Sequence, residues 1–384
     1  MTVEALSRLA EVHLFVVAND DLAGDVPGAD HAVRVATALR RRPPIPAQAV
    51  RWLTRPSLPD HLARFDLTAA ADALRAFVPR ERRLTWLCHP AAWLLARTAG
   101  VPGPTVCDLD DLEDFRQRSI DALRAVGEAR PPELGGAAGI ARRLRGQVDA
   151  GRWRRWRRTV AAEALPVLCS DLERRRSGLT AAAVVPNGYA VDPPPYGPSA
   201  PGVRVPTAVF VGSFHYLPNR DGARWLAAAI APELRRLDPA ATVRLVGPGP
   251  VEMTRLAQGP GVSWAGPVAD VGPELRFASV ALVPLRAGSG TRVKILEAWA
   301  HGVPVVSTPL GAEGLDARDG NEVLLATTAS GLARAVLEAG ADDALRRRLV
   351  EGGRARWRAA HTPDAIADAV ATVVARALQS SSGG

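Results

Sequence analysis

A glycine-rich turn followed by charged side chains lies in the second half of the chain. Gly288 and Gly290 frame the turn, and Thr291, Arg292 and Lys294 follow at the expected start of a helix. Glycines let a backbone approach a ligand closely, and the positive end of a helix favours an anion. Two cations within the first turn or so of that helix therefore predict a site for a diphosphate.

Lys294 is the only lysine of the chain, against 47 arginines. A compact ammonium group has properties that a planar guanidinium lacks, so its retention favours a functional position. The alternative is chance survival in a GC-rich genome whose lysine codons have drifted to arginine.

Glu297 follows Lys294 by three residues, on the same face of the expected helix. A carboxylate can accept hydrogen bonds from two vicinal hydroxyls, as in the acidic ribose contact of dinucleotide sites. The alternative is a surface ion pair between Lys294 and Glu297, worth about a few tenths of a kcal/mol.

A second glycine turn lies upstream, in the segment VFVGSFHYLPNRDG. A strand is expected to end at Gly212, and a helix to start near Arg220, with Ser213 and Asn219 between them. The backbone N–H groups and the positive helix end would face the same sheet edge as the first turn. One glycine turn alone is a weak signal.

Short β-branched runs alternate with helical patterns along the whole chain, which is typical of parallel sheets with crossover helices. The sequence predicts an α/β protein with two Rossmann-like lobes. The expected strands cover residues 12–17, 85–88, 105–108, 166–170, 182–185, 208–211, 243–246, 262–264, 280–285, 303–308 and 323–325. Two helices are expected over 341–360 and 362–378, followed by a disordered QSSSGG tail.

Proline and glycine are dense over residues 186–206, where they exclude regular structure. This places an N-terminal domain at 1–186, a linker at 187–206, and a C-terminal domain at 207–361. Residues 362–384 form a C-terminal helix that packs back on the N-terminal domain, and the tail.

Composition limits the function classes. The 384 residues carry a formal net charge of +8, which favours an anionic partner without choosing among nucleic acid, membrane and phosphorylated small molecule. The three separated cysteines argue against a disulfide framework or a zinc site. With no apolar run of about 18 residues and no export leader, the expected location is the cytoplasm.

The segments GSGTRVKILEAWAHGVPVVSTPLGAEGL, VFVGSFHYLPNRDGARWL and VVPNGYAVDP together resemble the retaining glycosyltransferases of the GT-B fold (family 4-like, group 1). Within that family the similarity is to bacterial exopolysaccharide-type sugar transferases. The resemblance spans roughly residues 105–360. It implies sugar transfer with retention from a nucleotide diphosphate sugar, with no cofactor and no metal.

The resemblance also implies roles for individual residues. Glu297 matches the second glutamate of the family's E-x7-E motif, which holds the ribose, whereas Ser289 replaces the first glutamate. Ser213, Asn219 and Arg220 stand where the family often has an arginine and a lysine for the diphosphate. The site implied for the donor is completed by Gly212, Gly288, Ser289, Gly290 and Thr291, with Arg292 and Lys294 as stabilising cations.

His89, in TWLCHP, resembles the histidine that many members direct toward the transferred sugar. A structural histidine is the alternative. Downstream, an acidic run invites comparison with a metal-binding DxD motif, but it also suits the start of a helix with Asp111 as N-cap. The run comprises Asp108, Asp110, Asp111, Glu113 and Asp114.

The N-terminus departs from the family, because residues 1–17 resemble the end of its first helix and its second strand. The first β-α unit is expected to be missing, through a late start or a genuine truncation. A catalytically impaired scaffold or partner subunit is therefore the alternative function, which Ser289 also favours. A dinucleotide-dependent oxidoreductase is disfavoured because no GxGxxG follows the first strand.

Residues 152–158 place five arginines around Trp153 and Trp156. This pattern suits either an anionic membrane surface, useful for a lipid-linked acceptor, or a helix packed through its tryptophans. Nucleic acid is not expected, because no recognition motif accompanies the charge. The remaining partners are the nucleotide-sugar donor and an acceptor of unknown identity.

Overall fold

The computed structural model of the chain describes residues 1–18, 26, 28–39, 42–79, 81, 83–126, 137–191 and 207–382. The chain divides into two compact units, each an α/β fold on a parallel sheet. Unit 1 comprises Met1–Arg118, Glu128–Pro186 and Pro363–Gly384, and unit 2 comprises Ser119–Gly127 and Asn187–Thr362. The two Rossmann-like lobes expected from the sequence are present. Residues 192–206 of the expected linker lie outside the described residues.

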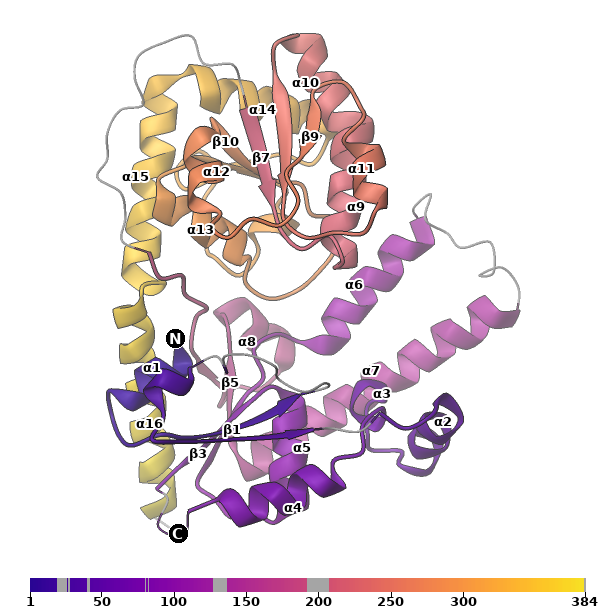
Figure 1. Cartoon of the computed structure of the whole chain (residues 1–384), viewed down its shortest axis with the longest axis vertical. Helices are drawn as coiled ribbons and strands as arrows, with labels where there is room; N and C mark the ends of the chain where they lie inside the picture. The colour runs from indigo at the N-terminus through magenta and orange to yellow at the C-terminus, as the bar shows by residue number, and fades with distance from the viewer. Residues whose placement is uncertain are drawn as a thin grey trace. The chain divides into compact units, whose positions relative to one another are not determined.

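Unit 2 contains a six-stranded parallel sheet in the order β12-β11-β10-β7-β8-β9. Its central strands are buried, because helices cover parallel sheets on both faces, as Figure 1 shows. The strands are β7 (Thr207–Val211), β8 (Thr242–Val246), β9 (Val262–Trp264), β10 (Val280–Val283), β11 (Val305–Ser307) and β12 (Leu324–Leu325). All six were predicted from their apolar runs.

The strand order contains a switch point. From β7 the chain proceeds to β8 and β9 on one side, and then crosses back to β10 on the other side of β7. In open α/β sheets, ligands bind outside the carboxyl ends of the strands at such a point. Both glycine turns follow these two strands, since Gly212 follows β7 and Gly288 follows β10.

Helices pack around this sheet. Trp299 of α13 is fully buried, and its indole Nε1 donates to the carbonyl of Glu322 at 3.0 Å. The helical elements are α9 (Leu217–Trp225), the π-turn η3 (Leu226–Ile230), α10 (Ala231–Leu237), α11 (Glu252–Leu256), α12 (Gly272–Phe277), α13 (Val293–His301), η4 (Leu310–Ala312), α14 (Ala329–Ala341) and α15 (Asp343–Ala360).

Unit 1 contains a four-stranded parallel sheet and a separate parallel pair. The sheet has the order β3-β4-β5-β6, with β3 (Thr85–Cys88), β4 (Thr105–Asp108), β5 (Leu165–Leu168) and β6 (Ala183–Val184). The pair joins β1 (His13–Ala18) to β2 (Arg34–Leu39). The sequence did not predict β2, because Thr37 interrupts its apolar residues and alternate residues of this strand are exposed.

The last helix of the chain belongs to unit 1. Ile366, Val370 and Val373 of α16 are buried in one cluster with Ala5 and Val106. This helix runs to Ser382, so the prediction of a disordered tail from residue 379 is wrong over 379–382. This last helix is α16 (Pro363–Ser382), and the other helices of unit 1 are α1 (Thr2–Ser7), η1 (Ala29–His31), α2 (Ile45–Thr54), α3 (Asp60–Ala63), α4 (Thr68–Phe77), α5 (Pro90–Ala99), α7 (Ala137–Glu163) and α8 (Asp171–Ser177). Helix α6 (Glu113–Val126) begins in unit 1, and its residues from Ser119 on belong to unit 2.

Candidate functional site

A tight turn at Gly212 forms the first part of the candidate donor site. A Cβ atom at this position would lie 2.8 Å from Asn219 Nδ2 and 3.2 Å from Lys294 Nζ. Any side chain would therefore displace two polar groups. Glycine keeps the end of β7 close to both of them, which is the close approach expected of a phosphate-binding turn.

Asn219 and Lys294 meet across the switch point. Lys294 Nζ donates to Asn219 Oδ1 at 2.6 Å, and Asn219 Nδ2 donates to the carbonyl of Ser213 at 2.9 Å. The ammonium group also lies 5.2 Å from the centre of the Phe210 ring. These contacts join α9, which follows β7, to α13, which follows β10. The structure thus brings together two predicted site residues that are 75 positions apart.

The ammonium of Lys294 lies in an unfavourable environment for a charge. Burial and, to a smaller extent, the Arg292 guanidinium lower the pKa of Lys294 to about 7, although the Glu297 carboxylate opposes both. Burial also raises the pKa of Glu297, against the effect of Lys294. In the part of the chain that the structure describes, no ion pair joins Lys294 to Glu297, so the alternative of a surface pair is not observed.

This environment predicts proton uptake on ligand binding. At about pH 8 the Lys294 amine is mostly neutral, because its pKa is about 7. A bound diphosphate would raise that pKa, since an adjacent negative charge favours the ammonium form. We expect binding of a nucleoside diphosphate to take up a fraction of a proton, and the affinity to fall as the pH rises above about 7.

Calorimetry in two buffers of different protonation enthalpy measures this uptake. Lys294→Met keeps the length of the side chain but cannot take up a proton, so it is the matched control. Equal uptake by wild type and Lys294→Met would contradict the prediction.

The second turn is held together by Arg292. The φ angle of Gly288 is +121° and that of Gly290 is +76°, both in the region that favours glycine. A Cβ at Gly288 would lie 3.0 Å from a guanidinium nitrogen of Arg292. Arg292 is buried and donates to the carbonyl of Ser289 at 2.6 Å. Its guanidinium therefore folds back over the turn that leads into α13.

Two further predicted residues line this turn. Ser289 is buried, and Thr291 Oγ1 is buried without a hydrogen-bond partner among the described residues. A buried hydroxyl without a partner costs free energy. A ligand oxygen at this position would satisfy Thr291.

Arg220 does not present a free cation. Its Nε lies 3.3 Å from the carboxylate of Glu252, which Arg224 also contacts at 3.0 Å. On the same helix, Asp221 accepts two hydrogen bonds from Arg286, at 3.0 and 2.8 Å. The charges around α9 are thus paired, which leaves Lys294 as the cation nearest Gly212.

Sequence reasoning missed Gly247, which follows β8. Its φ angle is +128°, and a Cβ there would lie 2.2 Å from the carbonyl oxygen of Gly212. The two turns therefore pack backbone against backbone. The GPGP segment directly after the apolar run at 243–246 was the available signal.

His89 lies in unit 1, at the end of β3. It is exposed and has a φ angle of +68°, a conformation that is rare for a residue with a side chain and is often found at functional sites. The backbone N–H of His89 donates to the backbone carbonyl of Asp108 at 2.8 Å. Burial and, to a smaller extent, the charge of Asp110 raise the pKa of Asp108 to about 6. The structure thus places a strained histidine beside a carboxyl group at the edge of this sheet.

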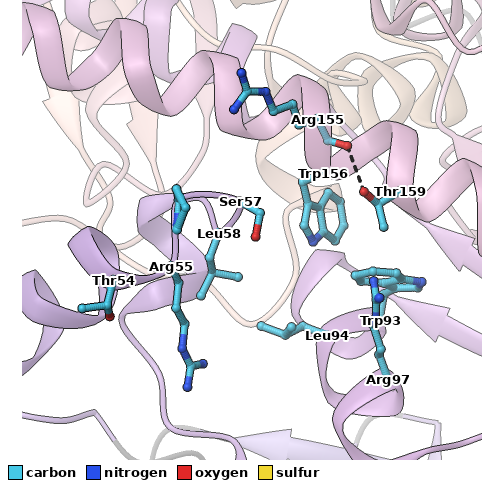
Figure 2. Close-up of a pocket in the computed structure, with 11 residues that line it drawn as sticks. Thr54, Arg55, Ser57, Leu58, Trp93, Leu94, Arg97, Arg155, Trp156 and Thr159 are labelled. Atoms are coloured by element: carbon cyan, nitrogen blue, oxygen red, sulfur yellow. Dashed lines mark hydrogen bonds between the residues drawn. The ribbon is translucent and has the colours of Figure 1, made fainter.

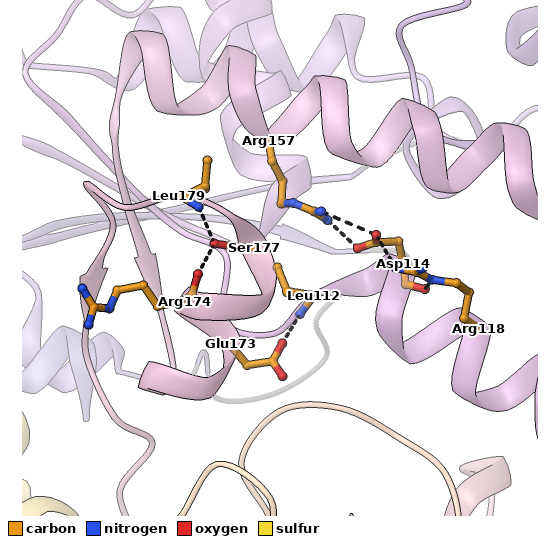
Figure 3. Close-up of polar contacts among 8 residues, drawn as sticks. All are labelled: Leu112, Asp114, Arg118, Arg157, Glu173, Arg174, Ser177 and Leu179. Atoms are coloured by element: carbon orange, nitrogen blue, oxygen red, sulfur yellow. Dashed lines mark hydrogen bonds and ion pairs between the residues drawn. The ribbon is translucent and has the colours of Figure 1, made fainter.

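The downstream part of the acidic run is structural, as Figure 3 shows. The buried Asp114 pairs with Arg157 of α7 and, at 3.1 Å, with Arg118. Helix α6 begins at Glu113, so the N-cap expected at Asp111 lies one residue too early. No cluster of three or more metal-ligating side chains occurs among the residues that the structure describes.

The aromatic face of residues 152–158 is part of the core. Trp153 and Trp156 are buried and pack edge to face, with ring centres 5.5 Å apart. The tryptophans are therefore not available to a lipid surface, and the alternative of a packed helix is correct for them. Three arginines of the segment remain exposed: Arg154, Arg155 and Arg158.

Residues 205–342 match the family model of glycosyl transferases group 1. Unit 2 carries a group 1 glycosyltransferase domain. The match includes every donor-site residue described above in unit 2. No curated protein sequence matches the chain.

Solved structures of similar fold extend over both units. Sucrose-phosphate synthase from Thermosynechococcus elongatus has a TM-score of 0.67 at 19% identity, covering 99% of this chain and 92% of that one. The UDP-forming α,α-trehalose-phosphate synthase from Burkholderia vietnamiensis has a TM-score of 0.57 at 15% identity, covering 97% and 100%. Anabaena HepE in complex with UDP and glucose has a TM-score of 0.56 at 14% identity, covering 97% and 100%. The fold of the chain is therefore GT-B.

None of the helices in the described ranges combines the length and the apolar character that crossing a bilayer requires.

Proposed function

We propose that the chain transfers a sugar, with retention, from a nucleotide diphosphate sugar to an acceptor hydroxyl. The hydrogen bond between Lys294 and Asn219 at the switch point carries this proposal, because it holds the only lysine of the chain beside two glycine turns. The group 1 domain supports it. The ligands named for Anabaena HepE, UDP and glucose, support a uridine nucleotide as donor.

In this proposal Lys294 binds the diphosphate beside the turns at Gly212 and Gly288, whose own N–H groups already donate to the Val246 carbonyl and to Ser119 Oγ. Arg292 keeps the turn in shape and adds positive potential, and Glu297 accepts the ribose hydroxyls. Such preorganised donors stabilise the charge that develops on the leaving group. A metal ion is not needed in this scheme, because the ammonium of Lys294 supplies the positive charge.

The transfer breaks the bond between the anomeric carbon and the diphosphate oxygen and forms a bond to the acceptor oxygen on the same face. The acceptor proton passes to the leaving phosphate. We assign His89 to the side of the transferred sugar in unit 1. The acceptor class is a glycan, a lipid-linked sugar or a small molecule, which fits polysaccharide biosynthesis at the cytoplasmic face of a membrane.

A comparison of UDP with pyrophosphate tests the role of Glu297. Glu297→Gln keeps the shape of the side chain but weakens its acceptance of hydroxyl protons, so UDP affinity should fall by about threefold to tenfold. Pyrophosphate has no ribose, and its affinity should stay within about twofold. Calorimetric titration of both ligands measures this. An equal loss for both ligands would assign Glu297 to the diphosphate or to the helix instead.

Turnover separates an enzyme from an impaired scaffold, the alternative that Ser289 favours by replacing the family's first glutamate. The experiment incubates the chain with a panel of nucleotide sugars and acceptor glycans and measures released nucleoside diphosphate. Binding of UDP without release from any donor would support the scaffold.

A further inference from the structure

Unit 1 contains a pocket apart from the sheet edges discussed so far. Its volume is about 460 Å³, and it lies between the segment that follows α2, helix α5 and helix α7, as Figure 2 shows. Leu58, Leu94, Trp93 and Trp156 form its apolar wall. The Trp93 and Trp156 rings meet edge to face, with centres 5.4 Å apart. The wall is therefore a rigid part of the core of unit 1.

The rim of this pocket is positively charged. Arg55, Arg97 and Arg155 line it, and no acidic side chain does. Arg97 is partly neutralised by Glu163 at 3.1 Å. Neither Arg55 nor Arg155 forms an ion pair with a carboxylate among the described residues. Arg55 and Arg97 stand on opposite sides of the opening in Figure 2.

A buried donor without a partner lies in the wall. Trp156 is 4% exposed, and its Nε1 has no hydrogen-bond acceptor among the described residues. In Figure 2 the nitrogen edge of the ring faces Leu58 and Leu94 across the pocket. An unsatisfied buried N–H costs about 1–3 kcal/mol, so a ligand oxygen that reached it would gain that contact.

We infer that this pocket binds an organic phosphate, with the phosphate at the arginine rim and the apolar part against Leu58, Leu94 and the tryptophans. A charged rim without acidic residues selects an anion, and guanidinium groups suit phosphate oxygens. The apolar wall selects a carbon chain over free phosphate. The site is separate from the donor site of unit 2 and does not depend on the proposed transfer reaction.

Nuclear magnetic resonance of the tryptophan indole N–H groups tests this site in the full chain. Butyl phosphate, inorganic phosphate and butanol are the three probes, and Trp156→Phe assigns the indole signal. Butyl phosphate should move the Trp156 signal saturably, inorganic phosphate should do so with at least about threefold weaker affinity, and butanol should have no effect at equal concentration.

Arg55→Gln and Arg155→Gln should each lower the affinity for butyl phosphate by about threefold to tenfold. Arg154→Gln is the matched control, because Arg154 is an exposed neighbour on α7 that does not line the pocket. UDP affinity should stay unchanged in all three variants, which separates this test from that of the donor site.

Vesicles distinguish a lipid headgroup from a small organic phosphate. Co-sedimentation with phosphatidic acid vesicles that is lost in Arg55→Gln would make the lipid the source. Butyl phosphate binding without such co-sedimentation would make the source a small molecule. Equal effects of Arg154→Gln and Arg155→Gln, equal affinity for inorganic and butyl phosphate, or an unmoved Trp156 signal would overturn the inference.

Discussion

Lys294→Ala is expected to weaken UDP binding by about tenfold to a hundredfold. The change removes a charge-assisted contact worth about 1.5–3 kcal/mol. It also leaves Asn219 Oδ1 without the donor that now lies 2.6 Å away, so the amide loses its fixed orientation beside Gly212. Calorimetric titration with UDP measures the loss.

Two further variants sharpen this test. Lys294→Arg should recover only part of the affinity, because a planar guanidinium differs in size and shape from the ammonium that now lies 2.6 Å from Asn219 Oδ1 and 5.2 Å from the centre of the Phe210 ring. The exposed Arg347 of α15 provides the control, since Arg347→Ala removes one positive charge from unit 2 at a distant surface. Wild-type affinity in Lys294→Ala would show that the residue is structural and that the donor site lies elsewhere.

Arg157→Ala is expected to lower the free energy of unfolding of unit 1 by about 3–5 kcal/mol, because it leaves the buried Asp114 carboxylate with a weaker partner. The Asp114 side chain is fully buried, and that of Arg157 is 5% exposed. Arg118 remains as a partner of Asp114, but its side chain is 52% exposed. Urea denaturation followed by circular dichroism measures the change.

Arg158→Ala is the matched control, because Arg158 is the exposed neighbour of Arg157. Its replacement should lower the free energy of unfolding by less than about 0.5 kcal/mol. The double variant Asp114→Leu with Arg157→Met should be more stable than Arg157→Ala, since it removes both charges and retains apolar volume. A loss below about 1 kcal/mol in Arg157→Ala would mean that Arg118 or water satisfies Asp114.

The central strands could be predicted from the sequence because each is marked by the apolar character of its own residues. The β7 and β10 segments are continuous apolar runs, and both are buried on both faces. By contrast, β2 has exposed residues at alternate positions and pairs only with β1, so no apolar run marks it.

Only part of the candidate site could be predicted from the sequence, because some of its contacts join residues far apart in the chain. Gly288, Lys294 and Glu297 lie within one short segment, whereas the partner of Lys294 is Asn219, 75 positions earlier. The pairing of Arg220 with Glu252 depends equally on tertiary packing. Residue types indicate which groups are able to bind phosphate, but packing decides which of them are already engaged.

Residues 152–158 show a third limit of prediction from the sequence. The spacing of Trp153, Trp156 and Val160 marks one face of a helix, but that periodicity is the same for a core face and for a lipid-facing one. The burial of Trp153 and Trp156, and the packing of Trp156 against Trp93 of α5, distinguish the two cases.

The membership of α16 in unit 1 has a consequence for synthesis on the ribosome. Residues 187–362 emerge before this helix, and the ends of that segment are tied together, since His361 Nδ1 lies 2.7 Å from the carbonyl of Asn187. Unit 2 can therefore complete its fold without waiting for α16. Unit 1, although its chain begins first, must wait for Ile366, Val370 and Val373 to cover Val106 and Val167. During that interval its nascent sheet exposes an apolar face, which is the state that a chaperone would recognise.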